Sequence, residues 1–248
     1  GKFIRNEDAE AAPYEKDADK LKRGTIHRWL EKRPVKFALL SLVVVLIGGL
    51  VEIVPTFLIK SNIPTIAAVK PYSPLELQGR DIYIREGCVS CHSQLVRPFR
   101  SETERYGEYS KAGEYVYDHP FLWGSKRTGP DLAREGNKYP NVWHYLHLED
   151  PRQMSPGSIM PRYSWLLTQT LDVSTTPAKI NAMRTLGVPY EKGYENFANQ
   201  DLEKQANEIT KDLINNGIPA ESDKDIIALI AYLQRLGTDI KVNQAIIK

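Results

Sequence analysis

The stretch Cys88-Val89-Ser90-Cys91-His92 contains both cysteines of the 248-residue chain. Thiols at this spacing can form thioether bonds with the two vinyl groups of a haem, while the imidazole beside them binds the iron. The motif is therefore typical of covalent haem attachment. We interpret Cys88 and Cys91 as the attachment residues and His92 as the proximal ligand of the iron.

Other kinds of site also use a pair of cysteines. A zinc site needs further Cys or His ligands at matching spacing, and the sequence has no second cysteine pair. A thioredoxin-like dithiol lies in a βαβ pattern that this sequence lacks, and a structural disulfide has no use for His92. Haem attachment is the interpretation that uses every residue of the motif.

A long apolar segment precedes the motif. Residues 37–59 read FALLSLVVVLIGGLVEIVPTFLI and carry one charge, at Glu52. At 1.5 Å per residue the segment spans about 34 Å, enough for the ~30 Å hydrocarbon layer of a membrane. A secretory signal would have a shorter apolar region after a short basic start. We predict a transmembrane helix over residues 35–60.

The charges around this segment predict its orientation. Residues 1–34 form a polar arm or linker, and Lys60 and Lys70 follow the span closely. Because basic residues concentrate on the cytoplasmic side, the arm is predicted to be cytoplasmic and residues 61–248 periplasmic, in a single-pass protein of the bacterial inner membrane. The basic residues before the span are Lys20, Lys22, Arg23, Arg28, Lys32, Arg33 and Lys36.

Helix signals follow the span. Residues 73–76, Ser-Pro-Leu-Glu, have the form of a capping box and predict a helix to about Arg85. Residues 222–225, Ser-Asp-Lys-Asp, are a second capping signal for a terminal helix that stops at Gly237. The chain is therefore predicted to be mainly α. Its net charge of +2 gives no electrostatic footprint for binding nucleic acid.

Residues 164–221 form a long insertion before the terminal helix. Helices are predicted over residues 177–186 and 201–215. The second helix either completes the core of the domain or offers a docking surface to another subunit. Its apolar face is predicted to contain Leu202, Ala206, Ile209, Leu213 and Ile214.

The order of these features resembles class I cytochrome c. A helix with Gly79 enters the motif, a Gly-Pro-x-Leu turn follows at residues 129–132, and the last helix carries Tyr232. The resemblance implies that the two terminal helices cross at the small Gly79. It also implies that the Pro130 carbonyl accepts a hydrogen bond from His92, which would set the tautomer and orientation of the imidazole.

The second axial ligand of the iron has six candidates in the sequence. Met160 lies in a segment rich in Pro and Gly that can hold a thioether toward the iron, and haem c prefers His/Met ligation. We predict Met160 as the distal ligand, with Met154 as an alternative. Met183 is expected to pack within a helix. The other candidates, which would give a bis-His haem of lower potential, are His119, His144 and His147.

From about Arg33 to Leu236 the sequence closely resembles the monohaem cytochrome c subunit, FixO or CcoO, of cbb3-type cytochrome c oxidases. The similarity includes residues 51–55, residues 186–190 and a segment rich in Arg, Tyr and Trp after His92. It implies one covalently attached haem c that passes electrons to a catalytic subunit with haem b and a haem b3–copper centre. A dihaem cytochrome c subunit is a further expected partner, and membrane lipid surrounds the span.

The resemblance also implies that the chain has no active site of its own. Calcium is possible at the subunit interface, with Ser125 as a candidate contact. Residues 1–32 are not typical of the stand-alone subunit and fit a fusion or an extension. Two alternatives stay open: the small cytochrome c subunit of nitric oxide reductase, and a free-standing, membrane-tethered cytochrome c shuttle.

Overall fold

The computed structural model describes residues 26–59 and 64–240. The chain divides into two units, Gly1–Ile63 and Pro64–Lys248. The described residues form no strand and have one isolated bridge, between Thr170 and Lys224. The mainly α class predicted from the sequence is therefore confirmed, whereas most of the predicted polar arm lies outside the described residues.

The first unit contains the short helix α2 (Ile26–Glu31) and the long helix α3 (Pro34–Leu58). Residues 34–56 of α3 are long and apolar enough to cross a membrane, and none of them is buried. Proline suits the first turn, where a backbone N–H would have no helical partner. Just before α3, the Trp29 ring lies under the cations of Arg33 and Lys36, 4.7 and 5.4 Å from its centroid.

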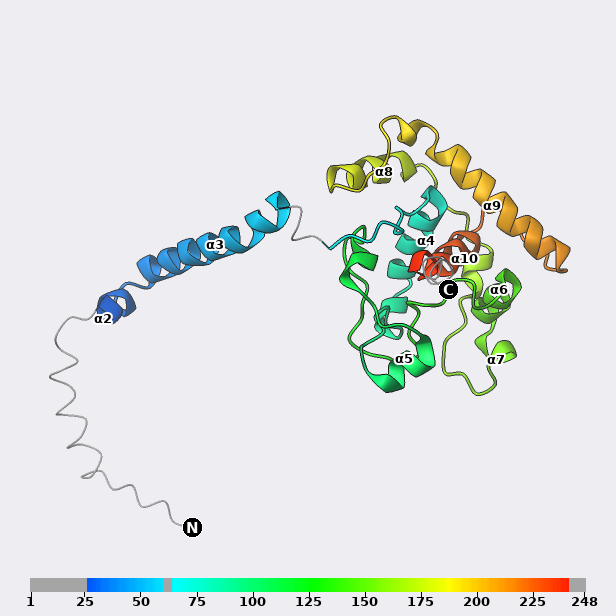
Figure 1. Ribbon diagram of the computed structural model, residues 1–248, viewed down its shortest axis with the longest axis horizontal. Helices are drawn as coiled ribbons and strands as arrows, with labels where there is room; N and C mark the ends of the chain where they lie inside the picture. Colours follow the sequence, from blue (N-terminus) through cyan, green and yellow to red (C-terminus); the bar gives the residue numbers. More distant parts are fainter. Residues whose placement is uncertain (1–25, 60–63, 241–248) are drawn as a thin grey trace, which may run out of the picture. The chain divides into compact units, whose positions relative to one another are not determined.

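The second unit is a helical domain (Figure 1). Its short 3-10 turns are η2 (Cys88–Ser90), η3 (Ala112–Tyr115), η4 (Ser164–Leu167) and η5 (Tyr194–Asn196). Its helices are α4 (Pro74–Arg85), α5 (Arg100–Tyr106), α6 (Asn141–Glu149), α7 (Pro151–Met154), α8 (Thr176–Thr185), α9 (Ala198–Asn215) and α10 (Asp225–Arg235).

Helices α4 and α10 cross at the centre of this domain (Figure 1). A Cβ atom on Gly79 would lie 1.9 Å from the Ala228 carbonyl oxygen, so only glycine lets the two backbones approach this closely. The Tyr83 and Tyr232 rings pack beside the crossing, 5.4 Å apart. The prediction that the terminal helices cross at Gly79 is confirmed.

The start of α4 follows the predicted capping box. The Glu76 amide donates to the Ser73 hydroxyl at 3.3 Å, and the Glu76 carboxylate accepts from the Ser73 amide at 2.7 Å. These two bonds satisfy backbone donors that the first turn of a helix leaves unpaired. The helix therefore begins at a defined residue and delivers the chain directly to Cys88.

The predicted capping signal at residues 222–225 is wrong in its register. Helix α10 begins at Asp225; Lys224 occupies its N-cap position with an extended backbone and makes no side-chain capping bond. The preceding residues pair with another segment, because the Leu171 amide donates to the Asp223 carbonyl at 2.8 Å. The Asp225 carboxylate instead accepts from Arg85 at 2.6 Å. Tertiary pairing thus overrides the local signal.

The insertion contributes to the core. Helix α9 begins three residues before its predicted start and buries Leu202, Ala206 and Leu213 in the main cluster. Ile214 is 55% exposed, so it does not share the buried side of the helix with the other residues of the predicted apolar face. Gly217, in the turn after α9, has a left-handed conformation that ends the helix. Met183 packs in a second small cluster, as expected.

Candidate haem site

The Cys-x-x-Cys-His motif forms a tight turn at the end of α4. Gly87 adopts a left-handed conformation, with φ of 72°, and the 3-10 turn η2 follows it. The amides of Cys91 and His92 both donate to the Cys88 carbonyl, at 3.1 and 2.9 Å. The turn therefore brings two thiols and one imidazole into a short stretch of chain.

Both cysteines of the motif are free thiols in the structure. Cys91 is exposed and Cys88 is half-buried. Burial, with a smaller contribution from Glu86, raises the pKa of the Cys88 thiol to about 12. A thiol that stays protonated is a poor nucleophile, so the Cys88 thiol lacks the lowered pKa of a redox-active cysteine.

The His92 ring is held by the turn at residues 128–130. Its Nδ1 atom lies 2.8 Å from the Pro130 carbonyl oxygen. Since a carbonyl accepts, Nδ1 is the protonated nitrogen, and Nε2 is left to bind a metal ion. Burial lowers the pKa of His92, which favours the neutral imidazole that metals require.

Gly129 leaves room for the His92 ring. A Cβ atom at residue 129 would lie 2.3 Å from Cε1 and 2.8 Å from Nδ1 of His92. The amides of Thr128 and Gly129 both donate to the Cys91 carbonyl at 2.9 Å. The turn and the motif are thus locked together, and the glycine is a steric requirement for the position of His92.

A buried network behind this turn was not predicted from the sequence. Asp131 accepts hydrogen bonds from the Ser93 hydroxyl at 2.6 Å and from the Leu95 amide at 2.8 Å. Arg127 connects it to Glu102 of α5, with contacts of 3.0 and 2.7 Å. The Arg127 side chain lowers the pKa of Glu102 to about 2. The many charged residues after His92 indicate that ion pairs form in this segment. They do not specify which side chains pair with one another.

Met160 lies in an irregular segment beside α6. Its half-buried side chain packs against the main core cluster, as do Cys88 and Val89. The segment is fastened to the helix because the Tyr163 amide donates to the Leu148 carbonyl at 2.8 Å. Met160 therefore packs on the same cluster as the turn that contains Cys88 and Val89.

The other candidates for the second axial ligand are spread through the domain. Met154 is half-buried at the end of α7, His119 is exposed, and Met183 is buried in the second cluster. His144 and His147 project from α6, and each has one buried ring nitrogen without a hydrogen-bond partner. Burial, and then His147, lowers the pKa of His144 to about 4.

The unpartnered ring nitrogens of His144 and His147 test whether this region can hold a haem. Burial and then the charge of His92 lower the pKa of His147. A buried polar atom without a partner is rare in a folded protein unless a further group satisfies it. The unpartnered ring nitrogens of α6 therefore fit a site in which a further group satisfies them.

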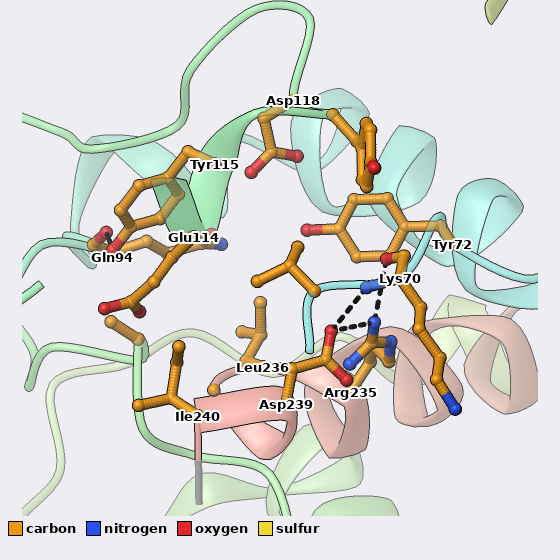
Figure 2. Close-up of a pocket in the computed structure, with 14 residues that line it drawn as sticks. Lys70, Tyr72, Gln94, Glu114, Tyr115, Asp118, Arg235, Leu236, Asp239 and Ile240 are labelled. Carbon is orange, nitrogen blue, oxygen red and sulfur yellow. Dashed lines mark hydrogen bonds and ion pairs between the residues drawn. The ribbon is translucent and has the colours of Figure 1, made fainter. Parts of the chain in front are cut away.

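A cavity elsewhere in the domain is too small for such a group. It has a volume of about 50 Å³ and lies where residues before α4 meet the end of α10 (Figure 2). Asp239 accepts from the Lys70 amide at 2.9 Å and pairs with Arg235 at 2.5 Å. The polar lining and the volume suit an ordered water molecule. None of the predicted haem ligands lines this cavity.

The sequence was also compared with known proteins. A family model described as "Cytochrome C oxidase, mono-heme subunit/FixO" matches residues 27–240. The chain belongs to this family. A search of the curated proteins found no match.

Membership of the FixO family makes the chain the mono-haem subunit of a membrane-bound cytochrome c oxidase. The family implies one haem and a catalytic subunit as partner. The apolar helix α3 is consistent with membrane attachment. Because the match begins at residue 27, it includes α3 and excludes most of the polar arm.

Proposed function

We propose that this chain is the electron-transfer subunit of a cbb3-type oxidase, passing single electrons through one haem c to the oxygen-reducing catalytic subunit. The contact between His92 Nδ1 and the Pro130 carbonyl carries the proposal, because it orients an imidazole for metal binding within the attachment motif. The family supports the oxidase over the small subunit of nitric oxide reductase.

We propose thioether attachment at Cys88 and Cys91, with His92 and Met160 as axial ligands. When bound, haem c supplies a centre that gains and loses one electron. The role of the chain is to position it: the motif tethers it, Pro130 orients the proximal imidazole, and Gly129 leaves space for that ring. If His92 and Met160 both held the iron, the haem would have no open position for oxygen and would serve electron transfer only.

The expected partners follow from the same proposal. Electrons leave toward a catalytic subunit with haem b and a haem b3–copper centre, and a dihaem cytochrome c subunit is a further partner. Calcium at the subunit interface stays a prediction, with the exposed Ser125 as a candidate contact. No role in binding nucleic acid is proposed.

We propose that α2 lies at the cytoplasmic face and that the haem domain is periplasmic. The pairing of Trp29 with Arg33 and Lys36 supports this orientation. An aromatic ring and two cations at one end of a span suit the membrane interface, and basic residues favour the cytoplasmic side. Protease protection of the arm in sealed cells would test it, and cleavage of residues 1–25 from outside would contradict it.

The proposal is tested on the purified complex. The denatured chain should keep one haem-sized mass increment, and acid-acetone extraction should not remove it. Cys88→Ala with Cys91→Ala should abolish this increment. The complex should consume oxygen; nitric oxide consumption instead would favour the reductase alternative. Isolation of the chain without partners in mild detergent would favour the free-standing shuttle.

A further inference from the structure

Three aromatic rings form a continuous stack along one side of α6. The Tyr139 and Trp143 ring centroids are 4.0 Å apart with an interplanar angle of 14°. The Trp143 and His147 centroids are 4.4 Å apart at 11°. Trp143 and His147 are four residues apart, which places them on one helix face, and Tyr139 lies just before the helix. We call this stack the aromatic column.

The column is held rigidly from the side. The buried His144 ring packs edge-on against Trp143, with centroids 5.3 Å apart and planes at 88°. It also packs edge-on against Tyr139 at 6.3 Å. Edge-to-face contacts of this kind are favourable and fix the orientation of the rings. The packing of His144 therefore fixes the stack on the helix and its preceding turn.

The inner end of the column lies at the candidate haem site. His147 has a buried Nδ1 atom without a hydrogen-bond partner. The hydrogen bond between Tyr163 and Leu148 fastens the Met160 segment to the same helix. The end of the column at His147 thus adjoins the point where the segment that carries Met160, our proposed distal ligand, is hydrogen-bonded to α6.

The outer end of the column opens on a surface groove. Tyr139 lines a groove of about 710 Å³ together with Lys138 and Gln205. Lys138 is exposed, and its ammonium lies 5.0 Å from the centroid of the Tyr139 ring. A partner that enters the groove would contact the first ring directly. The column therefore connects an accessible surface with the haem site.

We propose that the aromatic column is an electron route from the groove to the haem, an inference that rests on the proposed function. Rings in van der Waals contact transmit electronic coupling better than the same distance of solvent. One electron lost by a one-electron donor at the groove is accepted at the haem iron. The three rings end unchanged, with no bond formed or broken.

The test measures electron transfer from a label at the outer end. In the full chain with haem attached, Lys138→Cys supplies a single free thiol for a ruthenium photosensitiser, since thioether bonds occupy Cys88 and Cys91. Flash photolysis then gives the first-order rate of haem reduction. Trp143→Leu should slow this rate about tenfold or more, whereas Trp143→Phe should keep most of it.

A second label controls for effects on the haem itself. The photosensitiser at Lys126→Cys, an exposed residue outside the column, should reduce the haem at a rate that Trp143→Leu leaves unchanged. Trp165→Leu, a change of a 46% exposed tryptophan that is not stacked on the column, should leave both rates unchanged. The optical spectrum and reduction potential should stay the same in every variant.

Either of two results would overturn the proposal. One is a haem-reduction rate from the Lys138 label that, in both Trp143→Leu and Tyr139→Leu, stays within about twofold of the rate with the column intact. The other is an equal loss from both labels, which would place the effect at the haem rather than in the column. Both outcomes leave the proposed function intact, because haem reduction from Lys126 and oxygen consumption report on it separately.

Discussion

Gly129 determines where the His92 imidazole can lie. Gly129→Ala places a Cβ atom within 2.3 Å of the His92 ring, so the ring must move away from the Pro130 carbonyl. We expect a shifted reduction potential and a loss of about 1–3 kcal/mol in the free energy of unfolding. Redox titration and thermal unfolding of the full chain measure the two effects. Gly49→Ala, where nothing lies within 4 Å, is the control, and an unchanged potential would contradict the steric argument.

Met160 is the residue whose assignment most needs a direct test. Met160→His should keep the haem attached, because the thioether bonds are independent of the distal ligand, and should lower the reduction potential. Redox titration and loss of the sulfur-to-iron absorption band are the measurements. A retained band would point to another methionine. Met154 would then be favoured, because Met183 is buried in the second cluster.

The crossing of α4 and α10 depends on a single missing side chain. Gly79→Ala would bring a methyl group to 1.9 Å from the Ala228 carbonyl and force the helices apart. We expect a loss of about 1–3 kcal/mol or more in the free energy of unfolding. Denaturant unfolding of the full chain in detergent measures it. Ile84→Ala, at a 37% exposed position of the same helix, is the control and should cost much less.

The contact of α5 with the His92 turn should give a measurable pH dependence. Arg127 lowers the pKa of Glu102 from 4.5 to about 2, so this carboxylate stabilises the folded state above pH 4.5. That contribution is lost as the pH falls from 4.5 toward 2. The stability difference between the wild type and Glu102→Gln should therefore shrink over this range. A difference that stays constant with pH would show that the ion pair does not control it.

At the scale of the assembled complex, α3 is predicted to present a small, polar face to the catalytic subunit. Ser41, Val45, Gly48, Glu52 and Thr56 share this face at helical spacing. A carboxylate facing lipid would cost about 2.5–3.5 kcal/mol near mid-membrane, so we expect protein to cover Glu52. The alternative is that Glu52 lies near the outer interface and reaches water. The opposite face carries Leu39, Leu46, Leu50, Ile53 and Phe57.

Copurification tests this assignment of faces. Gly48→Leu should reduce the amount of catalytic subunit that copurifies with the chain, because a bulky side chain blocks close helix packing. Leu46→Phe, on the opposite face, should have little effect. If Leu46→Phe disrupts the complex and Gly48→Leu does not, the faces are reversed.

The sequence by itself determined the features that depend on neighbouring residues. The Cys-x-x-Cys-His motif lies within five residues, α3 is one apolar run, and the capping box at residues 73–76 closes through local hydrogen bonds. Each needs no information from distant parts of the chain. Family resemblance further predicted the contact of His92 with Pro130 and the crossing at Gly79, both of which the structure contains.

Tertiary structure decided the features that depend on distant partners. The start of α10 moved to Asp225 because Asp223 pairs with Leu171, and the Arg127 network joins α5 to the His92 turn. The aromatic column needs the turn before α6 to fold Tyr139 back onto Trp143. A local pattern cannot predict such contacts, because their free energy comes from packing between segments that the sequence does not place side by side.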